Sequence, residues 1–166
     1  MIKVMTIFGA ILFASSILTS CGGGGKSEKT KLNYSDEETT KANSQISVKP
    51  NIEHVVIKNG KPVISLSIEN NSSYQIDFMD IEVSIYNEFD QKIINGTVNY
   101  ASLLYSNKIG PGDKANATFD NITESDSQSK RNLLDILNSK SENELQKYKV
   151  YIDNWRLFEA STTGQN

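Results

Sequence analysis

The sequence predicts a mainly all-β domain, an antiparallel β-sandwich with a short helical insertion before its last strand. From residue 46 onward, short runs of alternating apolar and polar residues are separated by turn-forming residues, which is typical of antiparallel strands. Each run is apolar on one face only, so a second sheet is needed to bury that face. The 166 residues allow one domain of about 110–120 residues and an N-terminal extension.

The first expected strands form a hairpin. The run at 52–58 ends at Asn59-Gly60, a dipeptide typical of a tight two-residue turn. The following run, 62–70, places isoleucine and leucine on one face and serine and glutamate on the other. Gly96 lies inside a later run, where we expect it to mark a β-bulge. The remaining expected strands are 79–87, 92–100, 114–122 and 148–159.

Residues 123–147 separate the last two expected strands and are too long for a simple turn. Four apolar residues share one helical face there: Leu133, Leu134, Ile136 and Leu137. The expected helix caps are Asp126, Ser127 or Ser129. Ser141 with Glu144 forms a capping box for a second short helix. Two interpretations stay open: the apolar face is a lid over the end of the sandwich, or it is a surface that docks a partner.

Part of the domain resembles a known family. The stretch SLSIENNSSYQIDFMDIEVSIYNEFDQKI, followed by Gly110-Pro111-Gly112-Asp113, is similar to the FxLYD family of exported bacterial domains, over residues 55–122. The family's motif aligns with VSIYN at 83–87: Tyr86 matches it, whereas valine, isoleucine and asparagine replace phenylalanine, leucine and aspartate. The resemblance implies an immunoglobulin-like sandwich that serves as an accessory module for binding a ligand or partner, with no family active site.

The N-terminal segment predicts export and lipid anchoring. Lys3 precedes the mostly apolar run Val4–Leu18, which is shorter than the about 20 residues of a membrane span and is typical of a signal peptide. Leu18-Thr19-Ser20-Cys21 resembles the bacterial lipobox. That resemblance implies a signal peptide over 1–20, cleavage between Ser20 and Cys21, and acyl chains on Cys21. The expected location is the bacterial cell membrane, most of all the outer membrane.

The glycines after Cys21 admit a second interpretation, because Gly25-Lys26-Ser27 looks like the end of a phosphate-binding loop. That motif requires a glycine where Ser20 stands, and a helix after it. The polar residues that follow lack the periodicity of a helix. We therefore expect residues 21–45 to be a disordered tether, residues 46–160 to be the folded domain, and residues 161–166 to be a disordered tail.

Composition and motifs argue against several chemistries. The whole chain has 17 basic and 20 acidic residues, and removal of the signal peptide takes away Lys3 and no acidic residue. The mature chain is therefore acidic, and no nucleic-acid partner is expected. His54 is the single histidine, and we expect it to be a half-exposed strand residue. Asp120, Glu124 and Asp126 lack the spacing of a calcium loop. No catalytic residue, metal or cofactor is predicted. The five sequon asparagines are expected to be polar turn residues: Asn70, Asn71, Asn95, Asn116 and Asn121.

Two hypotheses about function follow. The first is a lipid-anchored envelope lipoprotein that acts as a non-enzymatic binding module, with the membrane as one partner and an envelope protein or glycan as the other. The second is a lipid-anchored hydrolase whose carboxylates meet in a loop cleft, because paired carboxylates leave no sequence motif. A concave pocket with two facing acids would favour the hydrolase.

Overall fold

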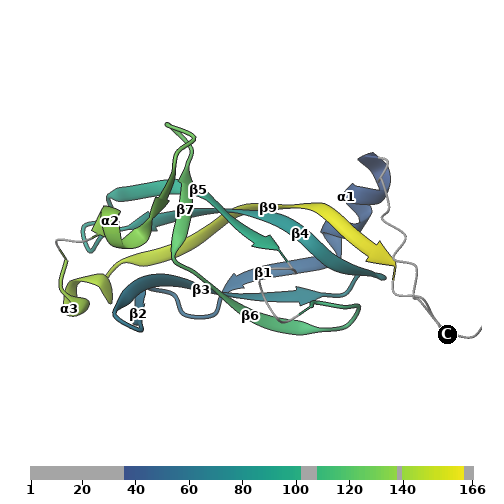
Figure 1. The fold of residues 1–166 in the computed structure, drawn as a ribbon, viewed down its shortest axis with the longest axis horizontal. Helices are drawn as coiled ribbons and strands as arrows, with labels where there is room; N and C mark the ends of the chain where they lie inside the picture. The colour runs from purple at the N-terminus through teal and green to yellow at the C-terminus, as the bar shows by residue number, and fades with distance from the viewer. Residues whose placement is uncertain (1–35, 102–107, 138–139, 163–166) are drawn as a thin grey trace, which may run out of the picture.

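The computed structural model describes residues 36–101, 108–137 and 140–162. These residues form two antiparallel β-sheets that pack face to face, with two short helices before the last strand (Figure 1). The predicted fold class, a mainly all-β antiparallel sandwich with a helical segment before its last strand, is confirmed.

The first sheet is built around β3 (Lys61–Asn70). On one side, β1 (Ile46–Pro50) pairs with the second half of β3, and β2 (Val56–Lys58) pairs with its beginning. On the other side, β3 pairs with β6 (Lys114–Phe119). Strand β1 was not predicted, and β2 is shorter than the expected run at 52–58.

The second sheet has the order β8-β7-β5-β4-β9. Its long strand β4 pairs with both β5 and β9. The bounds of these strands are β4 (Tyr74–Tyr86), β5 (Lys92–Ala101), β7 (Asn121–Glu124), β8 (Lys130–Asn132) and β9 (Lys149–Thr162). Strand β9 extends to Thr162, so the disordered tail expected at 161–166 was wrong for its first two residues. Residues 163–166 lie outside the described residues.

The core lies between the two sheets and follows the predicted alternation. Three alternate residues of β3 and three of β4 have no exposed surface, and burial of such side chains stabilises a fold by about 1.5–3 kcal/mol each. These six residues are Ile64, Leu66, Ile68, Ile81, Val83 and Ile85. The hairpin between β2 and β3 also forms as predicted: Asn59 and Gly60 have φ of 53° and 74°, as a type I′ turn requires.

Gly96 does not mark a bulge, contrary to the expectation. It pairs regularly with Val83 in β4 and with Glu124 in β7. The irregular register lies instead between Ile85 and Tyr86. A Cβ atom on Gly96 would lie 2.3 Å from the backbone oxygen of Thr123, so glycine is required because another backbone passes close to it.

The end of the expected tether is folded. Residues Asp36–Ser44 form helix α1, and Ala42 within it is only 1% exposed. The side-chain oxygen of Asn43 accepts a hydrogen bond from the backbone N–H of Leu157, at 2.8 Å. Strand β9 is an edge strand of the second sheet, and this hydrogen bond gives one of its outward backbone N–H groups an acceptor. The prediction of disorder up to residue 45 was therefore wrong for this segment, whereas the rest of the tether lies outside the described residues.

The insertion at 123–147 begins with a hairpin, not with a helix. Strands β7 and β8 continue the second sheet, and helix α2 (Leu133–Leu137) follows them directly. Its N-terminal backbone is capped by Asn132, whose side-chain oxygen accepts a hydrogen bond from Leu134 N–H at 2.8 Å. The expected caps at Asp126, Ser127 or Ser129 were wrong, because strand pairing extends past them. Helix α3 (Glu142–Leu145) carries the predicted Ser141–Glu144 capping box.

The apolar face of α2 is divided between core and surface. Leu133 and Leu137 are 0% and 2% exposed and belong to the core, as the lid interpretation expects. Ile136 is half-buried against the core, whereas Leu134 is exposed. Because buried side chains cannot contact a partner, the proposed docking surface was wrong for Leu133 and Leu137.

Asn70 holds together the end of the sandwich where the chain passes from β3 to β4. Its side chain has no exposed surface, and its Nδ2 lies 2.6, 3.1 and 3.0 Å from the backbone oxygens of Tyr74, Ile109 and Gly110. Its Oδ1 accepts hydrogen bonds from the N–H and hydroxyl of Ser72. Asn70 N–H also donates to the backbone oxygen of Asp113. One side chain thus joins the β3–β4 turn to the segment that leads into β6.

We predict that Asn70→Ala lowers the free energy of unfolding by about 3–5 kcal/mol, because it removes at once the five hydrogen-bond contacts of this buried side chain. The matched control is Asn71→Ala, since the neighbouring side chain is exposed and its loss should cost no more than about 0.5 kcal/mol. Urea unfolding followed by far-UV circular dichroism measures both. Equal midpoints for the two variants would contradict the role given to Asn70.

Candidate functional site

A groove of about 790 Å³ opens where the chain passes from β6 in the first sheet to β7 in the second. Its walls come from the β2–β3 hairpin, the first half of β4, the end of β5, the β6–β7 crossing and the start of β8. The residues that line it are Lys58, Asn59, Lys61, Val63, Phe78, Asn99, Ala101, Thr118, Phe119, Asp120, Asn121 and Lys130. Its volume falls in the range of about 300–1,000 Å³ that is usual for ligand sites.

The exposed lining of the groove forms a cationic rim. The apolar lining residues of the first sheet are almost fully buried and lie on opposite faces of that sheet: Val63 is 6% exposed, and Phe119, 3% exposed, is the cross-strand partner of the core residue Ile64. The ring of Phe78 is half-buried on the opposite sheet and packs edge-to-face against Phe158, with centroids 5.9 Å apart. Three lysines form the rim, and all are exposed: Lys58, Lys61 and Lys130.

The positive charge of the rim is not neutralised locally. Among the described lining residues Asp120 is the one carboxylate, and its Oδ1 accepts a hydrogen bond from Asn121 Nδ2 at 2.5 Å. None of the three lysines forms an ion pair with a carboxylate in the described part of the chain. Lys58 Nζ instead lies 3.5 Å from the hydroxyl of Thr118. The groove therefore has a local excess of positive charge, although the chain carries a net charge of −3.

The β2–β3 turn places two of these lysines directly opposite each other. Lys58 and Lys61 are direct partners in the β2–β3 register, on either side of the Asn59–Gly60 turn. Like charges at directly opposed positions of an antiparallel pair are destabilising. An anion bound between them would relieve that repulsion.

The residues that the sequence singled out lie mostly elsewhere. Ser20 and Cys21 fall outside the described residues. His54 is half-buried, as expected, and forms an isolated β-bridge with Lys149. Glu124 pairs with Arg131 at 3.0 Å, and within the ranges that the structure describes no three metal-ligating side chains cluster. Of the acids considered for calcium, only Asp120 lines the groove.

The groove itself was missed by sequence reasoning. A signal was present in the two lysines that flank Asn59-Gly60, because unlike charges are the usual choice for such opposed positions. Lys130 joins them only through the pairing of β8 with β7, which strand periodicity alone does not reveal.

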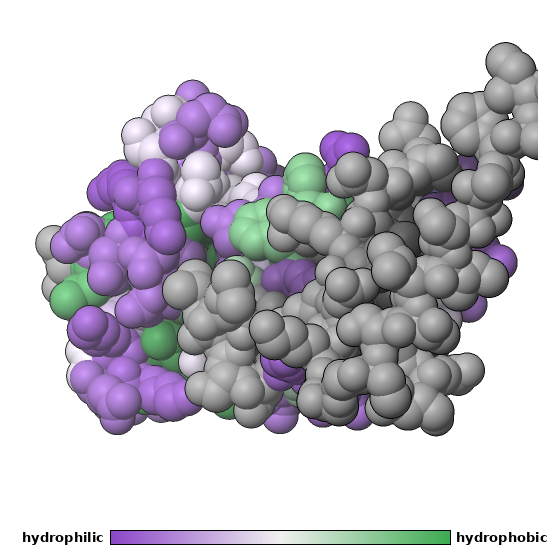
Figure 2. Space-filling view, turned by 45° about the vertical axis from the view of Figure 1, so that its right-hand side comes forward, coloured by the Kyte–Doolittle hydropathy of each residue, from purple (hydrophilic) through white to green (hydrophobic). Residues whose placement is uncertain are grey.

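In the face shown in Figure 2, hydrophilic side chains cover most of the coloured surface and hydrophobic ones emerge in a few separate areas.

Comparisons of the chain with protein-family models, with curated proteins and with solved structures find no match. None of the helices in the described ranges is both long and apolar enough to cross a membrane.

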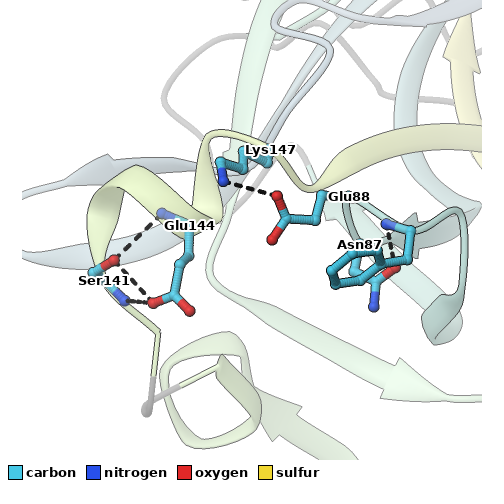
Figure 3. A network of polar contacts seen from close by, with 6 residues as sticks. Asn87, Glu88, Ser141, Glu144 and Lys147 are labelled. Carbon is cyan, nitrogen blue, oxygen red and sulfur yellow. Dashed lines mark hydrogen bonds and ion pairs between the residues drawn. The ribbon is translucent and has the colours of Figure 1, made fainter.

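A second polar cluster fixes helix α3 to the β4–β5 turn (Figure 3). Glu144 accepts hydrogen bonds from the backbone N–H and the hydroxyl of Ser141, at 2.8 and 2.9 Å. Lys147 Nζ lies 2.7 Å from a carboxylate oxygen of Glu88. The backbone hydrogen bond from Ser141 is the main cause that lowers the pKa of Glu144. The hydrogen bond to Glu88 raises the pKa of Lys147.

These two pKa shifts define the pH range in which the cluster stabilises the folded protein. Because the folded pKa of Glu144 is lowered, its contribution to stability is present above the unfolded pKa and is lost as the pH falls through the folded one. The pKa of Lys147 is raised in the folded state. Its contribution to stability is therefore present below the pKa of the unfolded state and is lost as the pH rises through the pKa of the folded state. The cluster is therefore intact near neutral pH.

We predict that Ser141→Ala raises the pKa of Glu144 part of the way to its ordinary value. The substitution removes the hydroxyl donor and keeps the backbone N–H, which is the larger cause. A titration of the Glu144 side-chain carbon by NMR measures the change, with Ser73→Ala, at an exposed turn position, as the control. An unchanged titration curve in Ser141→Ala would show that the hydroxyl does not act on this carboxylate.

Proposed function

We propose that the protein is a lipid-anchored lipoprotein of the bacterial cell envelope, that it acts as a non-enzymatic binding module, and that the groove at the β6–β7 crossing is its binding site. The observation that carries the proposal is a groove whose rim holds three lysines that form no ion pair in the described part of the chain. A concave site with a small number of charged groups is a usual place for a ligand to bind.

The anchor in this proposal rests on the sequence. The apolar run Val4–Leu18 and the lipobox-like Leu18-Thr19-Ser20-Cys21 support cleavage before Cys21 and acylation of its thiol. Helix α1, which follows the segment expected to tether the domain, lies at the opposite end of the sandwich from β2 (Figure 1). With the chain held at the α1 end, the β2–β3 turn and its two lysines would face away from the lipid surface.

The resemblance of residues 55–122 to the FxLYD family implies an accessory binding module built on an antiparallel sandwich. The hydrolase hypothesis receives less support. Hydrolysis by paired carboxylates needs two acids about 5–9.5 Å apart, and Asp120 is the one acid among the described lining residues. The binding module is therefore the function that the groove favours.

The proposal makes a prediction for the anchor and for the groove, both tested in intact cells. Cys21→Ser should leave an unprocessed precursor that no longer enters the detergent phase on phase partitioning, because one thiol carries the acyl chains.

A photo-crosslinking residue at Thr118, in the groove wall, should form an adduct with an envelope protein or glycan. The matched control carries the crosslinker at Asn116, an exposed position on the same strand.

A Cys21→Ser protein that is still processed and still partitions into detergent would contradict the anchor. Equal adducts from Thr118 and Asn116, or none from Thr118, would contradict the groove as the binding site.

A further inference from the structure

The dipeptide Asn-Gly occurs twice in the chain, and the structure places the two copies in different surroundings. Asn59-Gly60 forms the exposed turn between β2 and β3. Asn95-Gly96 lies inside β5, where Gly96 pairs with β4 on one side and with β7 on the other. Because glycine has no side chain to hinder its backbone nitrogen, that nitrogen can reach and attack the amide carbon of a preceding asparagine. The two copies therefore offer the same reaction in two environments.

The space around the two glycines differs. A Cβ atom built on Gly60 would meet nothing within 4 Å, whereas one built on Gly96 would lie 2.3 Å from a backbone oxygen of β7. The side chains differ as well. The Asn95 Oδ1 accepts a hydrogen bond from the Ser84 hydroxyl at 3.2 Å, and the Asn59 side chain forms no hydrogen bond with another described residue. The turn therefore has room for a rearrangement that the strand does not allow.

The turn can also open without disturbing the core. Strand β2 has three residues, and among the described strands it pairs with β3 alone. Its last pair places Lys58 directly opposite Lys61, and like charges at opposed positions weaken such a pair. Attack on the side chain requires the peptide between Asn59 and Gly60 to rotate, which is a local opening at the end of a short hairpin. The same rotation at Gly96 would break the pairing of β5 with two neighbouring strands.

The two lysines also favour the chemical step. The reaction begins when a hydroxide ion removes the proton from the Gly60 nitrogen and leaves a negative charge in the turn. A positive charge nearby favours the deprotonated form of a group. Lys58 and Lys61 flank the dipeptide on both sides, and neither forms an ion pair with a described carboxylate. Their charge is therefore available to stabilise the anion.

We infer that Asn59 is a site of spontaneous covalent modification in the folded protein, at which the side-chain amide is converted to a carboxylate. The Gly60 nitrogen forms a bond to the Asn59 Cγ, the bond from Cγ to Nδ2 breaks, and ammonia leaves with the proton. Water then opens the resulting succinimide ring at either carbonyl, which gives aspartate or isoaspartate. The reaction needs water and no oxidant or reductant. The inference does not depend on the proposed function.

The modification changes the candidate groove, because Asn59 is one of its lining residues. Aspartate at this position adds a carboxylate between two lysines of the rim, and Asp-Gly still suits a type I′ turn. Isoaspartate adds one carbon to the backbone of the turn, so a two-residue connection between β2 and β3 no longer fits. The charge of the rim therefore changes as the protein ages.

The test is peptide mapping by tandem mass spectrometry of the full-length protein, purified in detergent and aged at mildly alkaline pH in water enriched in a heavy oxygen isotope. The isotope marks conversion that occurs during ageing, because hydrolysis places one oxygen of water in the new carboxylate. We expect Asn59 to be converted at least about tenfold faster than Asn95, because a central strand opens far more rarely than a hairpin turn. In urea, which unfolds the protein, the two sites should react at similar rates.

The contribution of the lysines is tested with the variant that carries Lys58→Gln and Lys61→Gln. Conversion of Asn59 should slow about two- to fivefold, as expected for the loss of two exposed charge interactions. The matched control carries Lys49→Gln and Lys114→Gln, which change the net charge equally at exposed positions on β1 and β6. The control should react as the parent protein does. Added salt should slow the parent more than the Lys58/Lys61 variant, because salt screens exposed charges.

Three results would overturn the inference: no conversion of Asn59 in the folded protein, equal rates at Asn59 and Asn95, or a ratio of the two rates no larger than that measured in urea. The last result would show that the surroundings of the two dipeptides have no part in the reaction. Equal rates in the two lysine variants would contradict the role given to Lys58 and Lys61.

Discussion

The buried amide of Asn70 is the interaction on which the closed end of this sandwich depends. The chain changes sheet between β3 and β4 and changes back before β6, and Asn70 hydrogen-bonds to backbone at both places. A buried amide that lost these partners would cost the desolvation of every group involved. The two sheets are therefore joined at this end by polar contacts that specify one arrangement, in addition to the apolar core between them.

The crossing from β6 to β7 is built differently. Asp120 lies there with its carboxylate bonded to the adjacent Asn121, and the crossing opens onto the groove. Gly96 allows β7 to approach β5 closely and so to extend the second sheet. The candidate site thus lies where the two sheets are joined by a single strand crossing, near the start of β3, whereas Asn70 lies at the other end of that strand.

The sequence predicted the parts of the fold that depend on local periodicity. Alternation in β3 and β4 placed their core residues correctly, and Asn59-Gly60 predicted its turn. Helix α1 was missed because its residues have no apolar stripe; it is held by Ala42 and by a hydrogen bond from Asn43 to Leu157, 114 residues away. The groove was missed for a related reason. Its lysines come from β2, β3 and β8, and only the strand order brings them together.

Native-state hydrogen exchange tests most directly whether Asn70 closes this end of the sandwich. The amides of Asn70, Ile76 and Gly112 donate to the backbone oxygens of Asp113, Ile109 and Asn70, and all three bonds lie around the Asn70 side chain. If that side chain joins the two sheets, these amides should exchange only through global unfolding, with the same free energy as the central amides of β4. Exchange through local opening, at the rate of exposed amides such as that of Ser127 in the β7–β8 turn, would contradict the account.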